Sequence, residues 1–168
     1  MTSINIRPGV NVLSVLRHLN YKPWFALAEF VDNSLQSFLR HRDVLVEIEG
    51  EKPTLRVEIN IDSVDRRIII RDNAGGIHSS DFPRAFRAAE LPPDRSGLSE
   101  FGMGMKSAAC WFAPKWMART SALGETVERT VHFDIHSIVR DSLEELHVAE
   151  VDASAHSHYT EIVLEEVY

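Results

Sequence analysis

The chain has 168 residues, enough for one domain with its own hydrophobic core. Its hydrophobic content of 44% and charged content of 26% are typical of a soluble globular protein. A net charge of −7 argues against nucleic-acid binding by this chain alone, and a single cysteine, Cys110, excludes an internal disulfide and a cysteine-based zinc site.

The first ten residues lack the charged-then-apolar pattern of a signal peptide, and no apolar run approaches the length of a membrane span, so we expect a cytoplasmic protein without membrane contact.

The N-terminal third predicts helices. Residues 11–19 predict a short helix. A longer helix is expected from Pro23 to about Arg40, because proline favours the first turn and apolar residues recur at helical spacing. Residues 41–50 fit either a continued helix or a loop.

The rest of the chain predicts mainly strands. A hairpin is expected from residues 55–61 and 67–70, then a helix over 82–89, a loop over 91–101 and a helix after Gly102. Further strands are expected over 115–121, 126–135, 143–151 and 159–167. Early helices and late antiparallel strands predict one α/β domain, a two-layer sandwich with helices on one face of a mixed, mainly antiparallel sheet.

Glu29 and Asn33 are the first candidate site residues. They stand four apart in the predicted helix and therefore share one face. An acid and an amide in that relation could hold a metal and activate a water. Taken alone, the pair is equally compatible with a solvated helix surface.

The sequence RDNAGGI, residues 71–77, contains the second candidate. Asp72 directly follows an apolar strand, so its carboxylate is expected to be partly buried and to need a hydrogen-bond donor such as an adenine amino group. Gly75 and Gly76 would let a ligand approach the backbone. The alternative is a turn that only reverses the chain.

The sequence FGMGMKSAAC, residues 101–110, predicts an anion site. Gly102 and Gly104 precede a helix with Lys106 in its first turn, which combines exposed N–H groups, the helix dipole and a lysine. It is not the common phosphate loop, because Met103 stands where that loop requires lysine. The alternative is a glycine-rich helix entry selected for close packing.

Together, the three stretches resemble motifs of the gyrase, heat-shock chaperone, histidine kinase and MutL (GHKL) ATPase superfamily. ALAEFVDNS resembles its helix motif, RDNAGGI its adenine-pocket turn, and GLSEFGMGMKSA its lid and phosphate loop. The order and spacing are most similar to those of MORC-type ATPases. The resemblance extends from Trp24 to about Ile162.

The resemblance implies a role for each matching residue. Glu29 would be the general base that activates water, and Asn33 would bind Mg²⁺. Asp72 and Thr160 would hold adenine. The remaining nucleotide contacts implied are Gly76, Ile77, Gly102, Met103, Gly104, Met105 and Lys106, the last five under a lid of residues 91–101.

The implied function is Mg²⁺-dependent ATP binding and hydrolysis, with lid closure, a homodimer in the nucleotide-bound form, and a protein or DNA client engaged through other regions. Ala74 and Tyr159 replace glycines usual in the family. The second domain whose lysine reaches the terminal phosphate in relatives has no counterpart in these 168 residues, so we expect weak hydrolysis. Two alternatives remain: a nucleotide-gated interaction module without hydrolysis, and a kinase-type phosphotransferase, in which asparagine usually replaces Glu29.

The histidines suggest no metal site. His132 and His136 lie in strand-like sequence, where a four-residue spacing has no helical meaning. His156 and His158 flank a loop. We expect surface or structural roles for all four.

Overall fold

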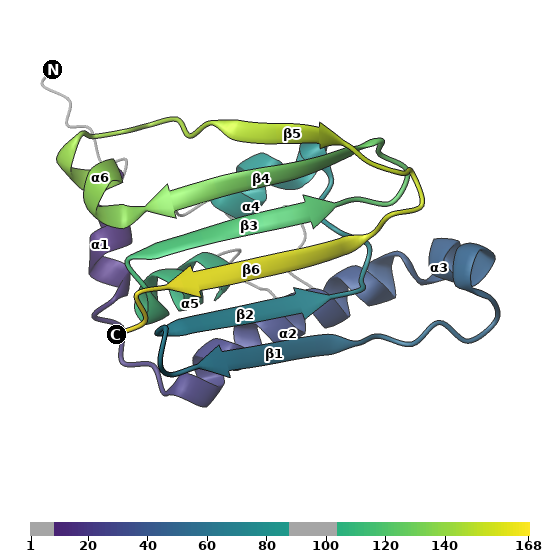
Figure 1. Ribbon diagram of the computed structural model, residues 1–168, viewed down its shortest axis with the longest axis horizontal. Coiled ribbons are helices and arrows are strands. Elements are labelled where there is room, and N and C mark those ends of the chain that lie inside the picture. The colour runs from purple at the N-terminus through teal and green to yellow at the C-terminus, as the bar shows by residue number, and fades with distance from the viewer. Residues whose placement is uncertain (1–8, 88–103) are drawn as a thin grey trace, which may run out of the picture.

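A six-stranded sheet forms one layer of the molecule, and the main helices pack on one of its faces (Figure 1). The computed structural model describes residues 9–87 and 104–168. The strands are β1 (Val57–Asp62), β2 (Arg67–Asp72), β3 (Lys115–Ser121), β4 (Val127–Asp134), β5 (Val148–Asp152) and β6 (Tyr159–Glu165). Their order is β1-β2-β6-β3-β4-β5, and all five pairings are antiparallel. The predicted two-layer α/β sandwich is confirmed.

Six α-helices and one 3₁₀ helix lie in the described ranges. They are α1 (Val12–Leu16), α2 (Pro23–Arg40), α3 (Arg42–Glu49), η1 (Ser79–Asp81), α4 (Phe82–Phe86), α5 (Gly104–Phe112) and α6 (Ile135–Arg140). Helix α2 has the bounds that the sequence predicts. None of the helices in the described ranges is both long enough and apolar enough to cross a membrane.

The core lies between the sheet and the pair α2 and α5. Helix α2 buries Ala26 and Phe30 against α5 and the sheet, and the central strands contribute Ile162 and Leu164. Cys110 is buried in this core, and burial raises the pKa of its thiol to about 11. The thiol is therefore a packing group rather than a nucleophile.

A smaller apolar cluster lies at the α3 end of the molecule. It joins Phe38 of α2, Leu45 of α3, Ala74 and Leu123. This cluster explains why residues 42–49 form a helix rather than a loop, because Leu45 is fully buried against α2. It also fixes the segment that follows β2.

Several boundaries differ from those expected. The helix predicted over residues 11–19 is limited to α1, which ends at Leu16, and the helix predicted over 82–89 ends at Phe86. Asp72 is the last residue of β2, where it pairs with Val57 and Thr160, rather than a turn residue. Residues 135–140 form α6, where the sequence predicts a strand that ends at residue 135 and no element over residues 136–140. The Asp134 carboxylate accepts a hydrogen bond from the Ser137 amide and caps this helix. Strand β5 begins at Val148, not at residue 143. The predicted lid, 91–101, lies outside the described residues.

Leu164 should be essential for stability, because its side chain is 0% exposed in the central strand β6. We expect Leu164→Ala to lower the free energy of unfolding by about 2–5 kcal/mol, measured by urea denaturation. Val64→Ala, at an 89% exposed position in the β1–β2 turn, is the control and should change it by less than about 0.5 kcal/mol. Equal losses would contradict this description of the core.

Candidate functional site

The carboxylate of Asp72 joins three elements at one end of the sheet. Its Oδ2 accepts a hydrogen bond from Ser34 Oγ of α2 (2.7 Å). Its Oδ1 accepts from the backbone amides of Ala74 (2.9 Å) and of Thr160 in β6 (3.2 Å). A carboxylate offers about four acceptor positions, so these three donors leave one for a ligand.

Burial raises the pKa of Asp72 above its ordinary value, although the hydrogen bonds from Ser34, Ala74 and Thr160 act in the opposite direction. The dominant effect is the removal of the charged form from water. The fold therefore holds a carboxylate in an environment that disfavours its ionisation. An external hydrogen-bond donor would relieve part of this cost.

Two threonines stand beside Asp72 on the helix-facing side of the sheet. Thr160 pairs with Asp72 and with Thr120 of β3. Thr120 Oγ1 accepts a hydrogen bond from the Ile77 amide (2.9 Å) and donates one to the Tyr159 carbonyl (2.9 Å). These contacts fix the chain after β2 against the ends of β3 and β6.

Gly76 is required by the fold itself. Its φ is +72°, and a Cβ added there would overlap the Ser121 carbonyl oxygen. A side chain would therefore be both strained and blocked. The sequence motif predicts a close approach at Gly76, and the partner in the structure is the backbone of β3.

Glu29 and Asn33 lie on one face of α2, as predicted. The side-chain amide of Asn33 donates to the Glu29 carbonyl (2.6 Å), which leaves the Asn33 oxygen as the atom for a metal or ligand. Burial, and secondarily the charge of Asp32, raises the pKa of Glu29.

Glu29 also meets the beginning of α5. A Cβ added at Gly104 would overlap the Glu29 carboxylate, so glycine there allows the acid to lie against the first turn of α5. That turn has backbone N–H groups without partners inside the helix. The contact brings together two stretches that the sequence separates by 75 residues.

Lys106 is only 2% exposed, and its ammonium group donates to the carbonyls of Arg84 (2.9 Å) and Arg87. The structure thus places this lysine against the end of α4. Met105 is partly buried against the main core. Gly102 and Met103, also predicted to contact the ligand, lie outside the described residues.

Helix α2 arranges the site in a line. Glu29 touches α5, Ser34 donates to Asp72, and Ser37 Oγ lies 3.4 Å from the Gly76 carbonyl oxygen. From Glu29 to Ser37 the helix rises about 12 Å. One rigid element therefore sets the spacing between the candidate groups.

The side chains of Ala74 and Tyr159, which replace glycines usual in the family, pack against other parts of the molecule. The Ala74 methyl packs into the cluster with Phe38 and Leu45, and its φ is not positive. The register places the side chain of Tyr159 on the opposite face of the sheet from Thr160. There its ring lies under the Arg71 guanidinium (4.2 Å), and its hydroxyl donates to Glu128 (2.5 Å).

Two contributors were not identified from the sequence: Ser34 and Thr120. Ser34 lies between Asn33 and the apolar face of α2, and its buried hydroxyl also lies 3.0 Å from the Phe30 carbonyl. A serine inside a helix is a weak signal of a tertiary partner. Thr120 gave no signal, because its hydroxyl acquires a partner only once β3 and β6 pair.

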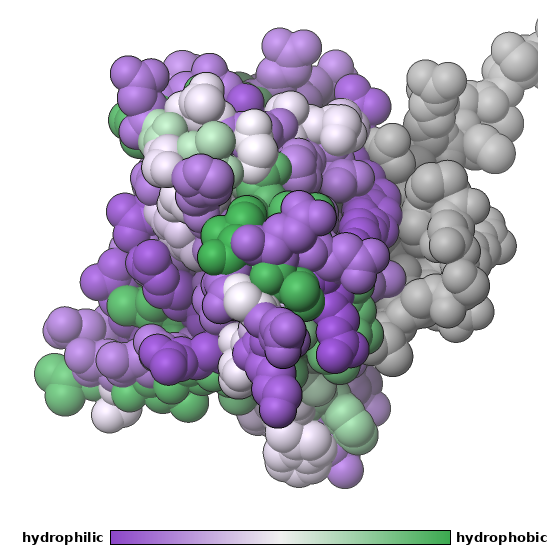
Figure 2. Space-filling model, turned by 90° about the vertical axis from the view of Figure 1, so that its right-hand side faces the viewer, coloured by the Kyte–Doolittle hydropathy of each residue, from purple (hydrophilic) through white to green (hydrophobic). Residues whose placement is uncertain are grey.

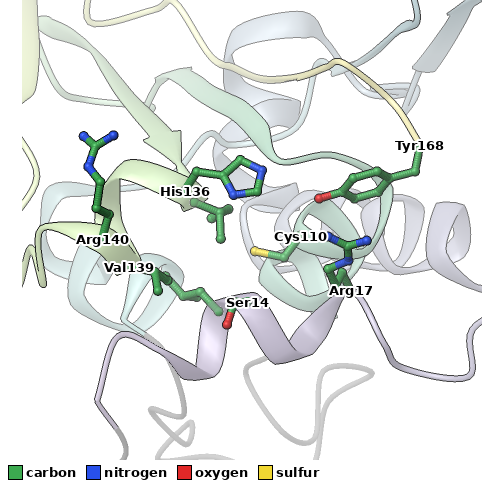
Figure 3. A pocket seen from close by; sticks show the side chains of 9 residues that line it. Ser14, Arg17, Cys110, His136, Val139, Arg140 and Tyr168 are labelled. Atoms are coloured by element: carbon green, nitrogen blue, oxygen red, sulfur yellow. The ribbon is translucent and has the colours of Figure 1, made fainter.

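A cavity of about 190 Å³ lies elsewhere, among α1, α5 and α6 (Figure 3). Apolar side chains such as Leu13 and Val139 line it, together with Arg17 and Tyr168, whose side chains stack at 4.8 Å. Its lining includes none of the candidate residues described above.

The model of a family described as histidine kinase-, DNA gyrase B-, and HSP90-like ATPase matches residues 21–163. A comparison with curated proteins finds no match. The matched segment contains all the candidate residues from Glu29 to Thr160.

Asp72→Asn should show how much the buried, ionised carboxylate lowers the free energy of unfolding. Because the folded state raises the pKa of Asp72, the stability contributed by its neutral form is present at low pH and lost as pH rises through the folded-state pKa. Asparagine stays neutral and keeps an acceptor for the Ala74 and Thr160 amides. We expect the variant to be about 0.5–1 kcal/mol more stable than wild type at about pH 7.5.

Urea denaturation at about pH 7.5 and about pH 3.5 measures this difference, which should vanish at the lower pH. Asp65→Asn, in the exposed β1–β2 turn, is the control. A variant equally destabilised at both pH values would mean that the hydrogen bonds to the charged form outweigh its burial.

Proposed function

Because the chain belongs to the family of histidine kinase-, DNA gyrase B- and HSP90-like ATPases, we propose that it binds ATP with Mg²⁺ and hydrolyses it along the inner face of α2. The observation that carries the proposal is the buried Asp72 carboxylate, held by three donors with one acceptor position left. Its position beside Ser34, more than one turn of α2 beyond Glu29, matches an elongated ligand with a base and a phosphate chain.

Asp72 binds the adenine in this proposal. Its remaining acceptor position receives the exocyclic amino group, and the hydroxyl groups of Thr160 and Thr120, 3.4 Å apart, lie beside it. A purine with a carbonyl in place of the amino group would bring its carbonyl oxygen against the Asp72 carboxylate, and neither group can donate a hydrogen bond to the other. Adenine specificity follows from this one contact.

Glu29 is the general base. It lies against the first turn of α5, whose N–H groups and dipole favour phosphate oxygens. Its raised pKa brings the carboxylate closer to the operating pH, where a base takes a proton most effectively. Glu29 orients the attacking water and accepts its proton, while the α5 amides stabilise the charge on the phosphate.

The described residues fit Mg²⁺ when the nucleotide shares in its coordination. No group of three or more His, Cys, Asp or Glu side chains in residues 9–87 and 104–168 is placed to hold a metal alone. The Asn33 side-chain oxygen, with its amide nitrogen bound to the helix, is a suitable hard ligand. When bound, Mg²⁺ would offset the negative charge of the phosphates.

Lys106 supports a second candidate function, a module that binds ATP without turning it over. Its ammonium group is bound to carbonyls at the end of α4 and is buried, so it is not directed at solvent. In this alternative, the nucleotide changes the surface presented to a partner, and its chemistry is not used.

The MORC-like motif order supports a finer proposal. ATP binding closes residues 91–101 over the phosphates and joins two chains, and the dimer acts on a protein or DNA client. The support for this finer proposal comes from the sequence motifs alone, because residues 91–101 lie outside the described part of the chain.

Glu29→Gln tests the function. It keeps the size and the acceptor oxygen of the side chain but removes the base. We expect ATP affinity, measured by calorimetric titration with and without Mg²⁺, to stay within about threefold, and phosphate release to fall about 10²–10⁴-fold. Unchanged turnover would remove Glu29 from the mechanism.

The same two measurements on wild type distinguish hydrolysis from binding alone. If wild type binds ATP stoichiometrically but releases no phosphate, the non-hydrolysing module is favoured. Because Glu29→Gln retains ATP, sedimentation of this variant with Mg²⁺ and ATP should show a dimer, and a monomer would contradict the proposed dimerisation.

Asp32→Asn should move the pH profile of hydrolysis. Turnover rises with pH as Glu29 loses its proton, and the Asp32 charge raises the pKa of Glu29. Removing that charge should therefore shift the acidic limb of kcat against pH to lower pH, by a few tenths of a pH unit to about one unit. A limb that stays in place would mean that another group controls it.

A further inference from the structure

The cavity among α1, α5 and α6 lies at the opposite end of the molecule from α3 (Figure 1). Each of the three helices contributes a buried side chain to its lining: Leu13, Cys110 and Ile135. The α3 end, which faces the viewer in Figure 2, is by contrast mostly hydrophilic, with only separate hydrophobic patches. The cavity therefore offers a ligand apolar contacts from three elements at one place.

The volume of the cavity limits the size of its ligand. It measures about 190 Å³. Apolar cavities of about 150 Å³ hold benzene, whereas drug-sized ligands occupy pockets of about 300–1,000 Å³. The space therefore fits one six-membered ring, or an aliphatic chain of about six carbons, together with one polar group.

The charged side chains at the cavity are basic. Arg17 of the α1 end and Arg140 of α6 both line it, and none of the nine described residues in the lining is Asp or Glu. A guanidinium group keeps its charge at every pH at which proteins are usually studied. The cavity therefore favours an anionic ligand, and this preference depends on no titration of a protein side chain.

The two arginines differ in their partners. Arg140 Nε and Nη2 both donate to the Asp141 carboxylate (2.8 Å each), and Figure 3 shows the Arg140 side chain directed away from the centre of the cavity. The Arg17 guanidinium instead lies over the Tyr168 ring, 4.8 Å from its centroid. Arg17 forms no ion pair within the part of the chain that the structure describes. It is therefore the arginine whose charge an anion can still balance.

Tyr168 holds the Arg17 guanidinium at the edge of the apolar lining. The Tyr168 amide donates to the carbonyl of Phe112, the last residue of α5 (3.0 Å), and its hydroxyl points toward the interior of the cavity (Figure 3). A guanidinium that meets a ring through its face keeps its N–H groups in its own plane, where a carboxylate can accept two of them. The stacked arginine is thus ordered before a ligand arrives.

We propose that this cavity binds a small organic monocarboxylate with an apolar body, such as an aromatic acid with a single ring. The carboxylate accepts hydrogen bonds from Arg17, and the ring contacts Leu13, Cys110 and Ile135. One arginine without an ion-pair partner balances one negative charge, so a monocarboxylate matches the cavity better than a dianionic phosphate does. The site shares no residue with the candidate ATP site and does not rest on the proposed function.

An NMR titration of the 168-residue protein with benzoate at about pH 7.5, where the ligand is ionised, tests the proposal. We expect saturable shifts of the amide signals of the lining residues, with a Kd on the order of 1 mM or below. Benzamide has the same ring without the charge and should bind about five- to tenfold more weakly. Acetate has the charge without the ring and should not saturate in the same concentration range. Equal affinity of benzoate for either control's level, benzamide or acetate, would overturn the proposal.

Arg17→Gln and Arg140→Gln form a matched pair of variants, because both arginines line the cavity but only Arg140 is bound to a carboxylate. Arg17→Gln should lower the affinity for benzoate about five- to tenfold, to that of benzamide. Arg140→Gln should stay within about twofold of wild type, because its charge is already balanced. Equal losses in the two variants would contradict the role given to Arg17.

Val139→Phe tests the cavity itself and gives a second route if Arg17→Gln does not fold. Val139 lines the cavity from α6, so the larger side chain would occupy part of the space while Arg17 stays in place. A folded Val139→Phe protein should lose saturable benzoate binding, and binding at wild-type strength would refute the site. Shifts confined to signals of the α3 end in wild type would also refute it, because the benzoate would then be bound elsewhere.

Discussion

The burial of one carboxylate, Asp72, determines how the site is built. A charge removed from water needs donors, and the fold supplies them from α2, from the turn after β2 and from β6. These elements are joined at the point where a ligand would bind. Burial also disfavours the ionised form of Asp72, which carries a free-energy cost. A ligand that donates a hydrogen bond to the carboxylate would lower that free-energy cost. Stability and binding therefore make opposite demands on one side chain.

Helix α2 transmits this constraint to the rest of the site. Its inner face touches Asp72 through Ser34 and reaches α5 through Glu29, while its apolar residues anchor it in the core. A motion of α2 relative to the sheet would change both ends of the site together. The glycines at 76 and 104 allow the close approaches on which this arrangement depends, the first to β3 and the second to Glu29.

The sequence predicted what is encoded locally. Pro23 and the apolar stripe placed α2 correctly, and the alternation of apolar and polar residues located the strands, because periodicity reflects which face is buried. It did not predict α6, whose cap depends on Asp134 and Ser137. The bond between Ser34 and Asp72 and the burial of Lys106 were also missed, since they join residues far apart in the chain. The motifs predicted chemical roles for Glu29 and Asp72, which stay predictions, but the protein groups that contact each carboxylate became visible only in the fold.

The strand order has a consequence for biosynthesis. Strand β6 follows the other five strands of the sheet in the sequence, but it lies between β2 and β3, which are formed from much earlier residues. Until the ribosome has released residues 159–165, the two halves of the sheet cannot join, and β2 and β3 each present an open edge. These pairings have a large sequence separation, which slows folding and exposes the nascent chain to aggregation. The candidate site, which needs Thr160 beside Asp72, therefore cannot be completed before β6 has been synthesised.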